Sequence, residues 1–321
     1  MIDFQVEIER TIRNNGRVCN VDLWEHLVEI IKSGKKLRPN FVLLLWKQYM
    51  SNKDVPQNLI SDLVALELIH TSTLIHDDII DEGQFRRNVA TLNHVYGNEI
   101  ALLMGNIVKD LALKIASQRS LSTLNNASFD VNLGQLWETL AREHETIGIN
   151  HYISIVLFKT SRIFSYCADT FSLYSKFYFT AIEKNFIVAM AVLYQIADDL
   201  IDSMSVKPKD KSVGQDKKNK VHSFVVASFD ETLLDFANGD GIEDFEEVQF
   251  IRKHIEIVRK NYSFRLKLEE LPVEKQKSFL VDLCAEMKGE MRKQNVNENL
   301  AKVLSIYFER IEHSITQMLI Q

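Results

Sequence analysis

Apolar residues recur at helical spacing along most of the chain, and few segments alternate with the period of two that marks a strand. This pattern predicts helices over 40–49, 59–80, 91–116, 134–144 and 152–168, one or two helices over 172–202, and three or four more between 224 and 321. The Ser/Asn-rich stretch 117–132 is predicted to be a connection between helices. Only 11 Gly and 4 Pro interrupt the chain, so we expect a predominantly helical protein.

Two acidic motifs stand inside this apolar pattern. Residues 75–81 read Ile-His-Asp-Asp-Ile-Ile-Asp, and residues 197–202 read Ala-Asp-Asp-Leu-Ile-Asp. Each motif places two carboxylates one turn apart on the same helix face, namely Asp77 with Asp81 and Asp198 with Asp202. Two carboxylates about 4 Å apart repel by about 4 kcal/mol at an effective dielectric of about 20. The motifs therefore call for a cation, and oxygen ligands without Cys or His favour Mg²⁺ bound together with substrate phosphates.

One acidic motif of this kind, taken alone, is more often a solvated helix face or helix end. The two copies lie about 120 residues apart, and both have apolar flanks. This repetition favours a divalent-metal site that binds a diphosphate.

The composition narrows the class of protein. With 321 residues, 46% hydrophobic and 26% charged, the chain suits a single all-α domain over residues 1–321. A net charge of -6 without a basic block does not favour nucleic-acid binding. Cys19, Cys167 and Cys284 are scattered, so they are interpreted as thiols in a reducing compartment. The polar N-terminus is unlike a secretory signal and the apolar runs are shorter than a membrane span, so a cytoplasmic protein is expected.

Basic residues accompany the acidic motifs. The segment 34–39, Gly-Lys-Lys-Leu-Arg-Pro, stands beside a predicted helix N-terminus, where backbone N–H groups favour an anion. Its alternative interpretation is a solvated basic loop. Arg86 and Arg87 follow the first motif, and the arginine fork suits phosphate oxygens. His70 lies two turns before Asp77; a lone His in such a position is usually a hydrogen-bonded core residue.

Taken together, six segments resemble the trans-prenyl diphosphate synthases, in matching order over roughly residues 30–222. They are 34–39, 67–81, Arg86-Arg87, 158–160, 194–202 and 211–216. The resemblance implies an all-α bundle of the isoprenoid synthase type, with a deep central cavity and usually a homodimer. It implies head-to-tail condensation of isopentenyl diphosphate with an allylic diphosphate to give an all-trans prenyl diphosphate.

The resemblance also assigns roles to residues. Mg²⁺, with three ions expected when substrate is bound, is assigned to Asp77, Asp81 and Asp198, supported by Asp78, Asp199 and Asp202. The allylic diphosphate is assigned to Arg86, Lys159, Thr160, Gln195, Lys211 and Lys220. Isopentenyl diphosphate is assigned to Lys35, Arg38, His70 and Arg87. Gln135 and Glu138 resemble a Gly-Gln-x-x-Asp helix that lines the cavity.

The chain departs from the family pattern at several positions. Asn88 and Ala90 replace the Gly and Pro that usually follow the paired arginines, and Asn106 stands where Gly-Asp is common. His222 and Phe224 replace the usual Thr and Pro. None of these changes removes a predicted metal carboxylate.

The length of the product is predicted from the residues that precede Asp77. In the family the prenyl tail grows back along this helix, and the residues five and four before Asp77 are Ser72 and Thr73. An aromatic residue there would stop growth at about fifteen carbons. Small side chains, followed by Ile69 and Leu66 deeper in, predict a product of twenty carbons or more. Alternatively, Ser and Thr merely bond their own helix backbone, which is compatible with an open path.

Other functions remain open from the sequence. A class I terpene cyclase would usually carry an Asn/Asp-Ser/Thr-Glu motif in place of 198–202. A prenyltransferase acting on a peptide or other acceptor would use the same scaffold without isopentenyl diphosphate. A non-catalytic subunit of a heteromeric synthase should have lost Asp residues, whereas an active subunit that needs a partner subunit would have kept them.

Overall fold

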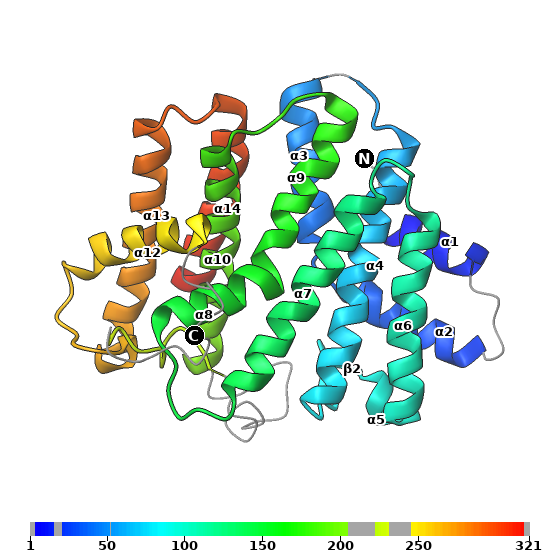
Figure 1. Ribbon diagram of the computed structural model, residues 1–321, viewed down its shortest axis with the longest axis horizontal. Coiled ribbons are helices and arrows are strands. Elements are labelled where there is room, and N and C mark those ends of the chain that lie inside the picture. The colour runs from blue at the N-terminus through cyan, green and yellow to red at the C-terminus, as the bar shows by residue number, and fades with distance from the viewer. Residues whose placement is uncertain (1–3, 16–20, 52, 205–221, 231–244, 318–321) are drawn as a thin grey trace. The chain divides into compact units, whose positions relative to one another are not determined.

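The computed structural model describes residues 4–15, 21–51, 53–204, 222–230 and 245–317 (Figure 1). It confirms the predicted all-α class, because the only β-strands in the described residues are the two-residue β1 (Phe85–Arg86) and β2 (Val89–Ala90), which form a short hairpin. The helices are α1 (Phe4–Asn15), α2 (Val21–Lys32), α3 (Leu37–Met50), α4 (Gln57–Ile80), α5 (Leu92–Tyr96), α6 (Asn98–Ile115), α7 (Leu121–Ala141), α8 (Ile149–Val156), α9 (Arg162–Ser175), α10 (Ala181–Met204), α12 (Glu246–Arg259), α13 (Val273–Lys293) and α14 (Glu298–Gln317). A π-helix, η1 (Leu157–Ser161), joins α8 to α9, and a short 3₁₀ turn, η3 (Leu268–Glu270), precedes α13.

Close contacts divide the chain into two compact units. The first contains the described residues of Met1–Phe129 and Tyr166–Phe177. The second contains those of Asp130–Ser165, Tyr178–Val206 and Lys220–Gln321. The single-domain organisation and the deep central cavity stay predictions.

α4 is the core helix of the first unit. Its 24 residues include no Gly or Pro, and apolar side chains on all its sides, such as Leu63, Leu66 and Ile69, are fully buried. It packs against α6, which runs beside it in Figure 1, and against α3. By length and composition α4 alone among the described helices would also suit a membrane span, a property shared by buried core helices.

α10 is the core helix of the second unit, and like α4 it is 24 residues long. It packs against α13, α14 and η1. Phe186 of α10 is fully buried and meets Phe250 of α12 edge-on, with ring centroids 5.1 Å apart. Each unit is therefore built around one long apolar helix, and each of these helices ends in one of the acidic motifs.

Several predicted elements differ in the structure. The predicted connection 117–132 is wrong, because α7 begins at Leu121. Leu124, Ala127 and Val131 are buried at helical spacing there, and this burial outweighs the weak helix propensity of Ser and Asn. α3 begins at Leu37 rather than at residue 40, so Arg38 lies in its first turn. The predicted helix 152–168 is interrupted by η1.

Candidate active site

The first Asp cluster, Asp77, Asp78 and Asp81, lies at the C-terminal end of α4. Asp77 and Asp78 are 7% and 8% exposed. Asp81 caps the helix, and its N–H donates to the Asp77 carbonyl at 2.8 Å. The predicted one-turn spacing of Asp77 and Asp81 is therefore present. The C-terminal end of a helix carries partial negative charge, so backbone and side chains favour a cation at the same place.

Asp78 has a different environment from its two neighbours in the cluster. The Arg86 guanidinium donates to it from Nη2 at 2.7 Å and from Nε at 3.0 Å, which makes a partly buried, bidentate pair. The Asp78 backbone carbonyl accepts from the Gly83 N–H at 2.8 Å and from Asn93 Nδ2 at 3.1 Å. Asp78 and Arg86 thus join the hairpin to the end of α4.

A cationic cluster lies in the same unit. Arg87 and Asn88 form the tip of the hairpin, and both have positive φ, 52° and 63°. A Cβ atom added at Gly34 would lie 2.9 Å from Arg87 Nη1 and 2.8 Å from Lys36 Nζ. Glycine at this position therefore leaves space in which two cationic side chains converge.

Lys36 is the residue of this cluster that sequence reasoning did not assign. Its side chain is 8% exposed, its Nζ donates to the Ile31 carbonyl, and it lies 3.9 Å from Glu67. Burial, reinforced by Arg87 and Arg38, lowers its pKa, which Glu67 partly offsets. Lys35, which was predicted to bind isopentenyl diphosphate, is exposed. The backbone of Lys36 is left-handed, with φ 51°, and this conformation accompanies the burial of Lys36 and the exposure of Lys35.

His70 lies within this cationic environment. Burial lowers the pKa of His70 well below its usual range, and Arg38, Arg87, Arg86 and Lys36 lower it further. Three of the four residues predicted for isopentenyl diphosphate, Arg38, His70 and Arg87, therefore share one positive field. A neutral His70 donates or accepts a hydrogen bond there without adding to the repulsion.

Stability should fall below about pH 6.5 because of His70. The native protein keeps His70 neutral, whereas the unfolded chain protonates it near its ordinary pKa of about 6.5, so the unfolded state gains protons as the pH falls. From pH 7.5 to 5.5, wild type should lose about 1 kcal/mol more of its free energy of unfolding in urea than His70→Gln. His94→Gln, at an exposed side chain, is the control. Equal losses in wild type and His70→Gln would contradict the expectation.

The residues predicted to set the product length are all buried in the first unit. Ser72 and Thr73 are 2% and 7% exposed, and Ile69 and Leu66 are fully buried. The Thr73 hydroxyl donates to the His70 carbonyl at 2.8 Å, so its polar atom is satisfied within α4. The Thr73 hydroxyl therefore needs no further hydrogen-bond partner on the helix face along which the prenyl tail is predicted to grow.

The second Asp cluster, Asp198, Asp199 and Asp202, lies near the end of α10 in the second unit. Asp198 and Asp202 stand one turn apart, and Asp202 is exposed. The Asp199 carboxylate accepts hydrogen bonds from Tyr152 Oη at 2.7 Å, Gln195 Nε2 at 2.8 Å and the Phe224 N–H at 2.9 Å. Burial raises the pKa of Asp199 to about 6, which these three donors oppose. Gln195, predicted for the allylic diphosphate, is therefore a partner of Asp199.

Lys159 and Thr160 lie in the π-helix η1, a type of turn often found at functional sites. Gly134 of α7 is in close contact with it, because a Cβ atom at residue 134 would collide with the Lys159 backbone nitrogen. Lys159 Nζ pairs with Glu138 Oε2 at 2.5 Å, and Gln135 Nε2 lies 3.4 Å from the same oxygen. Gln135, Glu138 and Lys159 are thus brought together, while the Thr160 hydroxyl donates to the Val156 carbonyl.

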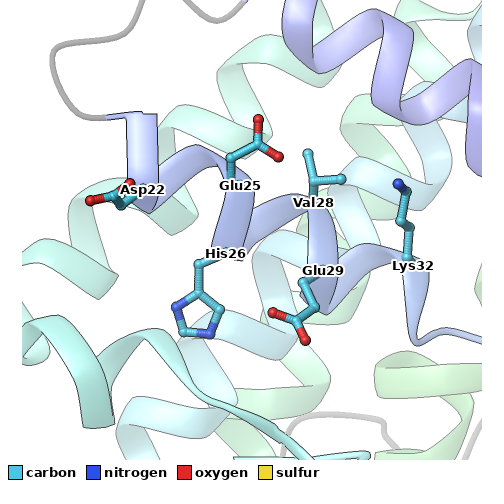
Figure 2. A pocket seen from close by; sticks show the side chains of 6 residues that line it. All are labelled: Asp22, Glu25, His26, Val28, Glu29 and Lys32. Carbon is cyan, nitrogen blue, oxygen red and sulfur yellow. The ribbon is translucent and has the colours of Figure 1, made fainter.

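Two predicted residues, Lys211 and Lys220, lie outside the described residues. Among the residues that are described, no three His, Cys, Asp or Glu side chains are grouped closely enough to hold a metal ion. A pocket occurs on α2, and Figure 2 shows that one helix supplies all the side chains lining it: Asp22, Glu25, His26, Val28, Glu29 and Lys32. None of the predicted site residues lines this pocket.

An all-α chain in which two long core helices end in Asp clusters, one beside a Lys/Arg/His cluster, has the features of a helical protein that handles diphosphates. The sequence profile of the family described as polyprenyl synthetase matches residues 22–235. The chain therefore belongs to the polyprenyl synthetase family, as its motifs predicted.

Individual relatives agree with this assignment. A geranylgeranyl pyrophosphate synthase of Geoglobus acetivorans is 27% identical over 282 residues, which cover 78% of this chain and 85% of that protein. A decaprenyl-diphosphate synthase of Dictyostelium discoideum is 30% identical over 178 residues, covering 53% of this chain but only 38% of that protein. The solved heptaprenyl diphosphate synthase of Staphylococcus aureus is 21% identical and covers 97% of this chain and 96% of its own, with a TM-score of 0.68. This last similarity shows the shared fold.

Proposed function

We propose that the protein condenses isopentenyl diphosphate with an allylic diphosphate, head to tail, and releases an all-trans prenyl diphosphate of twenty carbons or more. The observation that carries the proposal is the pair of Asp clusters, each with carboxylates one turn apart at the end of a core helix, in a chain of the polyprenyl synthetase family. The relatives' names include geranylgeranyl and decaprenyl products, which have twenty carbons and more.

The donor atoms fit Mg²⁺. The clusters offer carboxylate oxygens without thiolate, and such sites bind Mg²⁺ together with substrate phosphates. We propose Asp77, Asp81, Asp198 and Asp202 as the residues that hold it. When bound, Mg²⁺ neutralises the allylic diphosphate and stabilises the charge that develops on the leaving group.

The remaining chemistry belongs to the side chains of the chain itself. Arg38, Arg87 and His70, with Lys36, supply a positive field for the diphosphate of isopentenyl diphosphate. Lys159 and Thr160 bind the allylic diphosphate. For this, Lys159 breaks its ion pair with Glu138 and pairs with phosphate oxygens instead. The double bond of isopentenyl diphosphate forms the new C–C bond as the allylic C–O bond breaks. A proton is then lost to the released diphosphate, and apolar side chains exclude water from the cationic centre.

Product analysis is the experiment that tests this function. Purified protein with Mg²⁺, isopentenyl diphosphate and each allylic primer should give prenyl diphosphates of twenty carbons or more by mass spectrometry, and none in chelator. Farnesyl diphosphate as the sole final product would contradict the predicted length.

Consumption of the primer only with a peptide or another acceptor would instead support the alternative prenyltransferase. Activity that appears only with a second subunit would indicate a heteromeric synthase; for the active protein alone, light scattering should give a homodimer.

Ser72→Phe is expected to shorten the product by at least one five-carbon unit. Ser72 is 2% exposed on α4, so a phenyl ring there must occupy the path proposed for the tail. Ser72→Ala, which adds no volume, is the matched control and should keep the wild-type product. An unchanged product from Ser72→Phe, measured by mass spectrometry with a folded variant, would show that the tail does not follow this face of α4.

A further inference from the structure

Asp199 is the member of the second Asp cluster that is fixed from several sides. Its three hydrogen-bond donors come from α8, α10 and the segment 222–230. Tyr152 Oη and the Phe224 N–H share Oδ2, while Gln195 Nε2 binds Oδ1. A carboxylate whose two oxygens are held from three elements has little rotational freedom.

Tyr152 is well placed to hold this carboxylate. It is 2% exposed, and its ring packs against that of Phe224 with centroids 5.6 Å apart. Phe224 is fully buried and also contacts Phe279 of α13, with centroids 6.1 Å apart. Packing of the Tyr152 ring therefore fixes the position of its hydroxyl, independently of the hydrogen bond to Asp199.

The segment 222–230 is itself anchored beside α8. The Ser228 N–H donates to the Ile147 carbonyl at 2.9 Å, and the Ile149 N–H donates to the Ser228 carbonyl at 2.7 Å. His222 Nε2 lies 3.0 Å from the Ala141 carbonyl. The Phe224 N–H that donates to Asp199 would be absent if proline stood at this position. The third hydrogen bond to Asp199 therefore requires a residue other than proline at position 224.

The first Asp cluster has the same arrangement. There the second Asp, Asp78, is held by Arg86, while Asp77 and Asp81 are one turn apart. In both clusters the middle carboxylate is thus tied to protein, and the first and last carboxylates share a helix face. Groups that hydrogen-bond a metal ligand are commonly worth 10–100-fold in metal affinity. A group that holds the residue between two ligands acts one step further out, so the lower end of that range is expected.

We propose that Tyr152 is a positioning residue of the second cluster. Through its hydrogen bond to Asp199, and together with the Phe224 N–H, it holds the last turns of α10 so that Asp198 and Asp202 bind the Mg²⁺–diphosphate complex together. This inference rests on the proposed function, and it assigns to Tyr152 and Phe224 a role in binding without contact with the substrate.

The test is binding of inorganic pyrophosphate at a series of Mg²⁺ concentrations, measured by calorimetry without turnover. Tyr152→Phe, which removes only the hydroxyl, should weaken Mg²⁺-dependent pyrophosphate binding about tenfold. The matched control is Tyr262→Phe, because the Tyr262 hydroxyl donates to Asp282 at 2.6 Å in the same unit and its ring also packs on Phe279. The control should bind as wild type does. Tyr152→Phe should melt at a lower temperature than the control, because its lost hydrogen bond is buried and that of Tyr262 is exposed, so binding is compared at a temperature at which both variants are folded.

A second pair tests the backbone donor. Phe224→Leu keeps the N–H and loses the ring, whereas Phe224→Pro loses both, so Phe224→Pro should bind pyrophosphate several-fold more weakly than Phe224→Leu. Wild-type affinity in folded Tyr152→Phe, or losses that only follow the melting temperature, would overturn the inference. If Tyr152→Phe does not fold, equal affinities for Phe224→Leu and Phe224→Pro would overturn it. Failure of wild type itself to bind pyrophosphate with Mg²⁺ would instead overturn the proposed function.

Discussion

Asp77→Asn is expected to lower kcat/KM for the condensation about a thousandfold, as removal of a charge-stabilising group does in other active sites. The amide keeps the shape of the side chain but removes the charge that would hold Mg²⁺, so added Mg²⁺ should restore little activity. The free energy of unfolding should change by less than about 1 kcal/mol, because the substitution also removes the repulsion between residue 77 and Asp81. Steady-state kinetics and urea unfolding of the same preparation check both expectations.

Asp78→Asn, at the neighbouring residue, is the control: it should lose more stability and less activity than Asp77→Asn. It removes the charge that pairs with Arg86, whose partly buried guanidinium then lacks a carboxylate, so stability should fall by about 2 kcal/mol. Activity should fall less than in Asp77→Asn once the protein is folded and saturated with Mg²⁺. If the two variants lost activity and stability in the same proportion, the division of the cluster into binding and anchoring carboxylates would be wrong.

Gly134→Ala should destabilise the protein by about 2–3 kcal/mol and raise KM for the allylic diphosphate. The added Cβ would collide with the Lys159 backbone nitrogen, and a backbone, unlike the end of a flexible side chain, cannot turn aside. α7 and η1 must therefore separate, which moves Lys159 away from Glu138. Urea unfolding gives the change in stability, and initial rates at varied primer concentration give KM.

Gly289→Ala is the control for this substitution. Gly289 lies in α13 of the same unit, and an added Cβ would meet nothing within 4 Å. Alanine is favoured over glycine inside a helix, so this variant should be more stable by up to about 1 kcal/mol, with unchanged KM. Similar destabilisation of both variants would show that the close contact with Lys159 is not the cause.

The helices were predictable where burial and propensity agree. α4 is apolar on all sides and free of Gly and Pro, so its existence and its acidic end follow from the sequence. The first half of α7 was missed because its Ser and Asn residues suit a connection, and only the packed structure shows that Leu124 and Val131 are buried. The π-helix was also missed, because an apolar run carries no sign of one extra residue in a turn.

The candidate site also has features that the sequence predicts and features that only the structure shows. The spacing of Asp77 with Asp81 follows from the helical repeat alone. The partner of Asp199 could not be found from spacing, because Tyr152 is 47 residues away in the sequence. The choice between Lys35 and Lys36 depends on a left-handed backbone residue, which adjacent residues of identical chemistry do not reveal.

The π-helix at Leu157–Ser161 makes this part of the chain tolerant of a one-residue deletion. A π turn inside an α-helix holds about one residue more than an α turn does. Loss of one residue from η1 therefore closes the turn as ordinary α-helix, and the side chains of α9 keep their positions around the helix axis. Loss of one residue within α8 or α9 would instead rotate every later side chain of the helix by about 100°. A one-residue gap between aligned relatives is thus accommodated at Leu157–Ser161 and not in the regular helix on either side.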